Sequence, residues 1–231
     1  MLHKTQGVVL SFVKYRETSI ITRVYTEDFG LQSYIVNSVR SNSRKARSKI
    51  SFFQPLTQLD LVVYYRKDAN LNRISDIRCP SPYQSIPYDV LKSSVALFIT
   101  EMLNKCLKEE EGNAELFAFI RQSLLILDAL GSNYENFHLQ FMLKLSRYLG
   151  FVPQSAQAFF AQVYEFGGKP TITEGEKVLV NQLLEKRYTD HLPVSRITRQ
   201  LLLDDLVRFY QRHVAGFGDF NSLEVLREVL G

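Results

Sequence analysis

The sequence lacks tryptophan and has only two cysteines and four histidines among its 231 residues. Cys79 and Cys106 stand far apart, with no CxxC or Cys/His spacing around them, which argues against a disulfide framework and a structural zinc and favours a reducing compartment. The histidines are scattered and form no HExxH or HxxxH pair. We therefore expect neither a metal site nor a cofactor.

Long hydrophobic runs and catalytic motifs are absent as well. No apolar run approaches the roughly 18 residues of a membrane span, and the opening MLHKTQG lacks the apolar core of a signal peptide. No GxxxxGK[ST], GxGxxG or GxSxG motif occurs. Asp204 and Asp205 are adjacent on a predicted helix, where neighbours point about 100° apart, so we interpret them as a solvated face. The sequence predicts a cytoplasmic protein with no catalytic residue.

What the sequence does contain is an uneven distribution of charge. Residues 1–79 carry 13 Lys and Arg against 6 Asp and Glu, whereas residues 80–231 carry 15 against 18. A basic N-terminal part joined to a mildly acidic remainder indicates that the first part meets a polyanion and the second meets proteins or stabilises the assembly.

The basic part has the pattern of a small β domain. Short segments rich in β-branched and aromatic residues, bounded by turn signals, occur at 7–15, 19–27, 31–38, 56–66 and 72–78. Five strands with no helix-length segment between them favour a closed barrel. Alternation places Arg23, Tyr25, Tyr64 and Arg66 on an outward face that can stack bases and hold phosphates. The alternative is that these tyrosines merely cover the barrel edge.

Residues 37–49, NSVRSNSRKARSK, form the most basic segment of the chain. It contains five cations and no acid, and these cations are Arg40, Arg44, Lys45, Arg47 and Lys49. Unpaired cations on a loop suit a polyanion, because neutralising phosphates releases condensed counterions whatever the base sequence. A solvated loop that only aids solubility is the alternative.

From Pro80 onward the period becomes helical. After a proline-bearing linker we expect helices at 88–108, 113–130, 133–149, 173–188, 195–215 and from 221. Gly131 is the expected C′ residue of the second, and capping boxes are expected at 132–135 and 173–176. Residues 151–172 break the helical pattern. The sequence predicts two domains, 1–79 and 80–231, in an α+β protein.

In its order of features the chain resembles the bacterial RecO family of DNA-repair proteins. The resemblance rests on motifs spread over nearly the whole chain, at 15–19, 25–30, 39–44, 53–56, 149–153 and 220–226. It implies an N-terminal OB-fold, a helical domain and the role of recombination mediator. Such proteins bind single- and double-stranded DNA, anneal complementary strands and, with the partner RecR, help RecA displace single-stranded DNA-binding protein (SSB). The resemblance implies no catalysis and a place at the bacterial nucleoid.

One departure from the family concerns zinc. Many members carry four zinc-binding cysteines just after the position of Gly150, but residues 151–172 contain neither cysteine nor histidine. We expect this segment to lack zinc and to be held by packing of its apolar side chains, which are Phe159, Phe160, Val163, Tyr164 and Phe166.

Two sets of candidate site residues follow. For DNA binding the set is Arg16, Arg23, Tyr25, Arg40, Arg44, Lys45, Arg47, Lys49, Tyr64 and Arg66. The resemblance implies that the helical domain receives the acidic, Phe-ended tail of SSB, which needs an apolar pocket and cations. For this peptide the set is Phe117, Arg121, Phe141, Lys144 and Arg147, with core and solvated face as the alternative.

Two other functions stay open at this point. An RNA-binding OB module with a helical extension would use the same basic loop and aromatic face, because base stacking does not read the 2′-OH. An enzyme whose active site forms between the domains, without a visible motif, is the other. Annealing of DNA by the pure protein, and nucleotide or metal dependence of any activity, would separate these readings.

Overall fold

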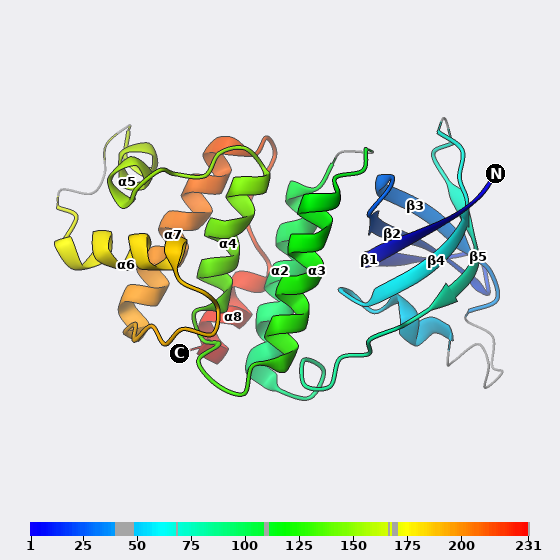
Figure 1. Cartoon of the computed structure of the whole chain (residues 1–231), viewed down its shortest axis with the longest axis horizontal. Helices are drawn as coiled ribbons and strands as arrows, with labels where there is room; N and C mark the ends of the chain where they lie inside the picture. The colour runs from blue at the N-terminus through cyan, green and yellow to red at the C-terminus, as the bar shows by residue number, and fades with distance from the viewer. Residues whose placement is uncertain (40–48, 68, 109–110, 166, 168–170, 231) are drawn as a thin grey trace. The chain divides into compact units, whose positions relative to one another are not determined.

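The chain forms two compact units in the computed structural model, which describes residues 1–39, 49–67, 69–108, 111–165, 167 and 171–230. One unit consists of residues 1–84 and 99–125, and the other of residues 85–98 and 126–231. Helices α2 (Val90–Cys106) and α3 (Ala114–Ala129) contribute residues to both units (Figure 1). The domain boundary expected at residue 79 stays a prediction.

The first unit contains a closed five-stranded barrel. Its strands are β1 (Leu2–Tyr15), β2 (Ser19–Thr26), β3 (Gly30–Val36), β4 (Gln58–Tyr64) and β5 (Asn72–Arg78). They neighbour one another in the order β1-β2-β3-β5-β4, with β1 closing the ring and only the β3–β5 pair parallel. This is the arrangement of an OB-fold. The predicted α+β protein, with an N-terminal OB-fold followed by helices, is confirmed.

Strand β1 closes the barrel by pairing with two strands at once. Gly7 is opposite Thr26 of β2 and also opposite Leu59 of β4. A Cβ atom on Gly7 would lie 2.6 Å from Val24 Cγ1 and 3.0 Å from Leu61 Cδ1, so a side chain here would have to displace two core side chains. The strand begins at Leu2, not at residue 7 as the pattern predicted, because the first residues pair with β4 although they alternate poorly.

The inward side of the barrel is the one that alternation predicted. Leu59, Leu61 and Val63 of β4 point inward with Ile20 and Val24 of β2, and all five are at most 2% exposed. The opposite residues of each strand point outward.

Residues 99–125 cover part of this outward surface within the first unit. Phe117 of α3 packs on Tyr25, with 6.3 Å between ring centroids, and Tyr25 is only 2% exposed. Asn104 of α2 donates to the carbonyl of Leu10 at 3.1 Å, and Gln58 donates to the carbonyl of Arg121 at 3.1 Å. Part of the outward surface of the barrel, including Tyr25, is therefore interior to the unit.

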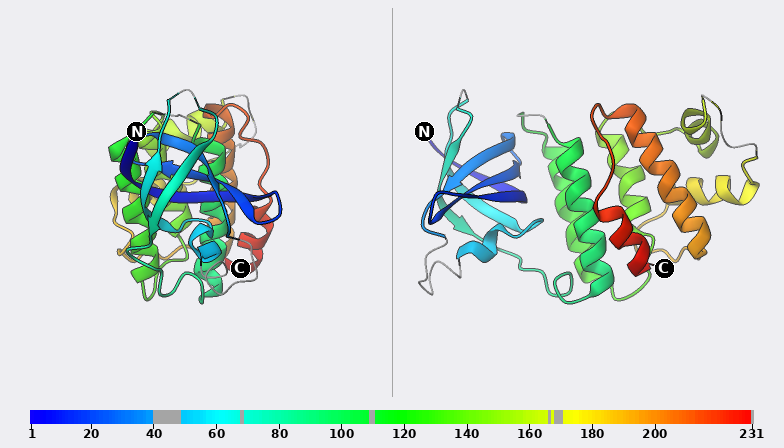
Figure 2. Two further views of the ribbon diagram at one scale, coloured as in Figure 1. Left: turned by 90° about the vertical axis from the view of Figure 1, so that its right-hand side faces the viewer. Right: turned by 180° about the vertical axis from the view of Figure 1, so that it is seen from behind.

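The second unit is helical. In addition to its parts of α2 and α3 it contains α4 (Phe137–Tyr148), α5 (Ala156–Val163), α6 (Glu174–Glu185), α7 (Arg196–His213) and α8 (Ser222–Leu230), as Figure 2 shows from two sides. Helix α5 corrects the expectation that residues 151–172 break the helical pattern. Ser155 caps this short helix, and Phe159 and Phe160 bury it at 0% and 1% exposed.

Two of the expected helix ends differ from the structure. The capping box of Thr173 and Glu176 is present, but α4 begins at Phe137, so the box expected at 132–135 is wrong. The side chain of Asn136 bonds instead to the carbonyl of Leu192 at 2.8 Å and to Arg199 Nε at 2.9 Å, which leaves it no part in capping. The expected positive φ of a C′ glycine occurs after α4, at Gly150 (φ 85°), and not at Gly131.

Asp205 also differs from its sequence interpretation. It is 3% exposed, accepts a hydrogen bond from Tyr164 and lies 3.9 Å from Arg208. The interpretation of Asp204 and Asp205 as one solvated face is wrong for Asp205, because its carboxylate is buried and hydrogen-bonded to Tyr164 of the 151–172 segment.

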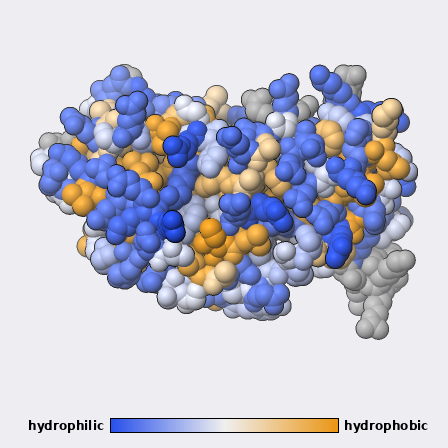
Figure 3. All heavy atoms as spheres, viewed as in Figure 1, coloured by the Kyte–Doolittle hydropathy of each residue, from blue (hydrophilic) through white to orange (hydrophobic). Residues whose placement is uncertain are grey.

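Apolar side chains that reach the surface are dispersed among polar ones. On the face drawn in Figure 3, hydrophilic residues predominate and apolar patches lie between them. None of the helices in the described residues is long and apolar enough to cross a membrane.

One buried histidine makes the stability of the helical unit depend on pH. His138 is 0% exposed, and neither ring nitrogen has a hydrogen-bond partner. Burial, aided by the nearby Arg199, lowers its pKa to about 3. Between about pH 6.5 and 3 this histidine is protonated in the unfolded chain but neutral in the folded chain. The free energy of unfolding therefore falls as the pH falls, by at most about 1.4 kcal/mol per pH unit.

We expect His138→Leu to keep its stability near pH 7.5, since no hydrogen bond is lost, and to flatten this pH dependence. Urea unfolding between pH 5 and 7.5 measures both effects. His191→Leu, at an exposed position, is the control and should keep the wild-type slope. Equal slopes in all three proteins would contradict the assignment.

Candidate nucleic-acid interface

The basic segment leaves the barrel between two buried anchors. Val39 is 0% exposed, and its N–H donates to the carbonyl of Thr18 at 2.9 Å. Ser19 Oγ donates to Asn37 Oδ1 at 3.0 Å. On the far side, η1 (Ser51–Phe53) buries Phe53 completely in the same barrel core. The segment is thus fixed to the barrel on both sides, and its Val39 end lies next to the β1–β2 turn.

Only Lys49 of the five segment cations falls in the described part of the chain, where it is half-buried. Arg40, Arg44, Lys45 and Arg47 lie outside the described residues, and their role in DNA binding stays a prediction.

The β1–β2 turn places Arg16 beside the stem of this segment. Arg16 is exposed, and its Cζ lies 5.2 Å from the ring centroid of Tyr15. Its φ is 50°, in the left-handed region that glycine occupies without cost. Ser38, in the stem, also has a positive φ of 58°. Non-glycine residues held in this region are typical of functional turns, since glycine would relieve the strain.

The four residues predicted to share one outward face are split between two sides of the barrel. Arg23 and Tyr25 lie on the β1–β2–β3 side, where Arg23 Nη1 donates to Asn104 Oδ1 at 3.4 Å. Tyr25 is buried, and burial raises its pKa to about 12. The expectation that the ring of Tyr25 is exposed is therefore wrong. Phe117 of α3 covers it, which alternation along the strand could not show.

Tyr64 and Arg66 lie on the β1–β4–β5 side and are exposed, Tyr64 at 47%. Tyr64 is opposite Leu2 on one side and opposite Arg73 on the other. Arg73 and Lys14 are two further exposed cations that the sequence reasoning missed. The alternation of Arg73 with Ile74 and Asn72 would have placed Arg73 outward.

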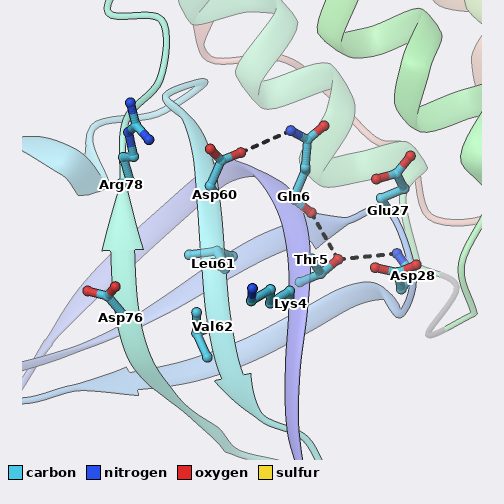
Figure 4. Close-up of a pocket in the computed structure, with 10 residues that line it drawn as sticks. All are labelled: Lys4, Thr5, Gln6, Glu27, Asp28, Asp60, Leu61, Val62, Asp76 and Arg78. Carbon is cyan, nitrogen blue, oxygen red and sulfur yellow. Dashed lines mark hydrogen bonds between the residues drawn. The ribbon is translucent and has the colours of Figure 1, made fainter.

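The β1–β4–β5 side becomes acidic away from Tyr64. A groove of about 430 Å³ lies there, with Lys4 and Gln6 from β1, Asp60 from β4, and Asp76 and Arg78 from β5 (Figure 4). Gln6 Nε2 donates to Asp60 Oδ1 at 2.9 Å. Two more carboxylates of the β2–β3 turn, Glu27 and Asp28, line the groove. The groove is lined by four carboxylates and two cations, so its net charge is negative and disfavours phosphate. This part of the barrel surface is therefore acidic.

The residues predicted for the acidic peptide belong to both units. Phe117 and Arg121 are in the first unit, and Phe141, Lys144 and Arg147 are in the second. Phe117 and Phe141 are 2% and 0% exposed, so each is a core residue and not the wall of an open pocket.

The cations of this peptide set are more accessible. Arg147 is exposed, and Arg121 is half-buried. Lys144 donates to the carbonyl of Lys186 at 2.9 Å and lies 5.8 Å from the ring centroid of Tyr188. Burial, with a contribution from Arg147, lowers the pKa of Lys144.

The segment without zinc ligands packs through its aromatic side chains. Phe159 meets Phe160 and Phe209, with ring centroids 5.0 and 5.1 Å apart, whereas Phe166 lies outside the described residues. With neither cysteine nor histidine, the segment offers no thiolate or imidazole for zinc. Among the described residues of the chain, no three His, Cys, Asp or Glu side chains gather as a metal site.

The barrel, its basic end and the helical unit define an OB-fold protein with a helical extension. Residues 1–83 match the family model "Recombination protein O N terminal" and residues 87–224 match "Recombination protein O C terminal". The chain is 35% identical to the DNA repair protein RecO of Flavobacterium psychrophilum over 98% of each chain, and 37% identical to that of Bacteroides fragilis over 99% of each. The chain belongs to the RecO family of bacterial DNA repair proteins.

The strained turn gives a prediction that separates stability from binding. Arg16→Gly should leave the protein equally or slightly more stable, by up to about 1 kcal/mol, because glycine accepts the positive φ. The same change should weaken DNA binding, since it removes a cation beside the basic segment. Arg16→Ala keeps a Cβ at the positive φ, so it should weaken DNA binding without the gain in stability. Thermal unfolding and DNA titration of the two variants test this, and a loss of stability in Arg16→Gly would contradict it.

Proposed function

We propose that this RecO-family chain is a non-catalytic recombination mediator. It binds single- and double-stranded DNA, anneals complementary strands and, with RecR, assists RecA loading on DNA coated with SSB. The observation that carries the proposal is the anchored start of the basic segment, where Val39 is buried and its N–H donates to Thr18 of the β1–β2 turn that contains Arg16. Cations gathered at one end of a barrel suit phosphates, which single strands and duplexes share.

The family supports the remaining parts of the proposal. The relatives are named as DNA repair proteins, which agrees with a DNA-binding role. We place the protein in the bacterial cytoplasm, at the nucleoid. The helical domain is proposed to receive the acidic tail of SSB. Arg147 is exposed and is the proposed contact for a carboxylate of the tail, whereas Phe117 and Phe141 are buried and offer no open pocket for its phenylalanine ring.

The proposal is tested by annealing of complementary oligonucleotides coated with SSB. The pure protein should accelerate annealing without nucleotide or added metal. Complementary RNA strands run in parallel measure the competing RNA-binding function. An annealing rate equal to that of the SSB-coated oligonucleotides without the protein would reject the proposal. Faster annealing of RNA than of DNA would favour the RNA-binding alternative.

Neutralising the basic segment should weaken DNA binding without regard to sequence. Replacing Arg40, Arg44, Lys45, Arg47 and Lys49 by Gln should raise Kd similarly for unrelated sequences. Plots of log K against log salt should become shallower by up to about 0.7 per lost contact on single strands and 0.9 on duplexes. Fluorescence anisotropy over a salt series measures both quantities.

A pair of double variants separates local contacts from net charge. Arg44→Gln/Arg47→Gln and Lys4→Gln/Arg78→Gln each remove two positive charges, but the second pair lines the acidic groove. Only the first should change the salt slope. Equal effects of the two pairs would show that net charge, and not the basic segment, governs binding.

A further inference from the structure

The β1–β2–β3 side of the barrel has an open apolar end. Val13, Ile21 and Ile35 are register partners on three neighbouring strands and point outward. Val13 is 61% exposed, and the two isoleucines are half-buried. Tyr15 lies two residues beyond Val13 on the same side of β1 and is also half-buried. We call these four residues the apolar strip.

The strip is the uncovered continuation of the face that α2 and α3 bury. Moving along β2, Tyr25 is buried by Phe117, Arg23 touches Asn104, and Ile21 belongs to the strip. The aromatic ring available at the open end of this face is therefore Tyr15, whereas Tyr25 at the covered end is closed.

Two cations border the strip. Arg16 stands over the ring of Tyr15. Ile35 is opposite Arg73, and the basic segment starts just beyond the end of β3. An apolar surface bordered by cations complements a chain of apolar bases and anionic phosphates better than it complements a protein.

We propose that the apolar strip contacts the bases of single-stranded DNA, with Tyr15 as the stacking ring and Arg16 at the adjoining phosphate. The inference rests on the proposed function and names the part of the DNA that this site takes. Three strands about 4.8 Å apart span room for two or three bases. In a duplex the bases are already stacked on one another, so the strip contributes only to single-strand binding, while the cations contribute to both.

The test compares a fluorescent 20-nucleotide oligothymidylate with a blunt duplex of the same length. Tyr15→Ala and Val13→Ser should each weaken binding of the single strand, Tyr15→Ala by at least about fivefold, and leave the duplex within twofold of wild type. Tyr15→Phe keeps the ring and should bind the single strand almost as wild type does. Tyr88→Ala and Val90→Ser, at residues 84% and 70% exposed in the second unit, are matched controls without effect.

An abasic strand isolates the bases themselves. Replacing the thymines by abasic sites keeps the phosphates, so it should weaken binding to the wild type by a larger factor than binding to Tyr15→Ala, which has already lost the stacking ring. Because the chain has no tryptophan, Tyr15→Trp introduces a single tryptophan that can be excited selectively at wavelengths where tyrosine does not absorb, and the single strand should quench its fluorescence whereas the duplex should not.

The outcomes separate the inference from the proposed function. If the wild type binds neither oligothymidylate nor duplex, the proposed function fails. If it binds both, but the abasic strand binds as tightly as oligothymidylate or Tyr15→Ala weakens both DNAs equally, the inference alone is overturned. The inference is supported if Tyr15→Ala binds the single strand more weakly than wild type does, binds the duplex as wild type does, and differs less from wild type on the abasic strand.

Discussion

Closure of the barrel by β1 is the constraint on which the rest of the molecule depends. The N-terminal half of this strand pairs with β4 and its C-terminal half pairs with β2, with Gly7 at the point where both pairings meet. A side chain at Gly7 would collide with the core side chains of Val24 and Leu61. Because one strand serves both sides, its first half lines the acidic groove, and its last residues carry Tyr15 and Arg16 to the basic end.

The division of charge follows from this geometry. The net positive charge of residues 1–79 is not spread over the barrel, since Asp60, Asp76 and the β2–β3 turn gather around one groove. Among the described cations, Arg16 lies at the β1–β2 turn and Lys49 in the basic segment, while Arg66 and Arg73 lie near Tyr64, away from the groove. The carboxylates around the groove oppose a polyanion on that part of the barrel.

Much of the fold could be predicted from the sequence, because local pattern determines it. Alternation identified all five strands and the inward residues of β4, and helical spacing identified the helices except α5. The first five residues of β1, Leu2 to Gln6, were not predicted to be in the strand, since they pair with β4 but alternate poorly between apolar and polar. The parallel β3–β5 pair joins segments distant in sequence and leaves no local signal.

The candidate site was less predictable, because burial of an outward strand residue depends on what packs against it. Tyr25 and Tyr15 both fit the outward pattern, yet Phe117 buries the first and leaves the second at the open end. The helix N-terminus at Asn136 shows the same limit, since Leu192 and Arg199 claim its side chain from far along the chain. Local pattern assigns a side chain to a face, whereas tertiary contacts decide whether that face is available.

The cover of α2 and α3 also shapes what the barrel can bind. An OB-fold that exposes its whole β1–β2–β3 face can read several bases, but here only the end near Val13 remains open. If the apolar strip contacts bases as proposed, its short length allows few base contacts, and nearby cations would supply affinity that does not depend on sequence. Such a surface would discriminate weakly between sequences. That property would suit the proposed mediator role, because repair intermediates arise at any sequence.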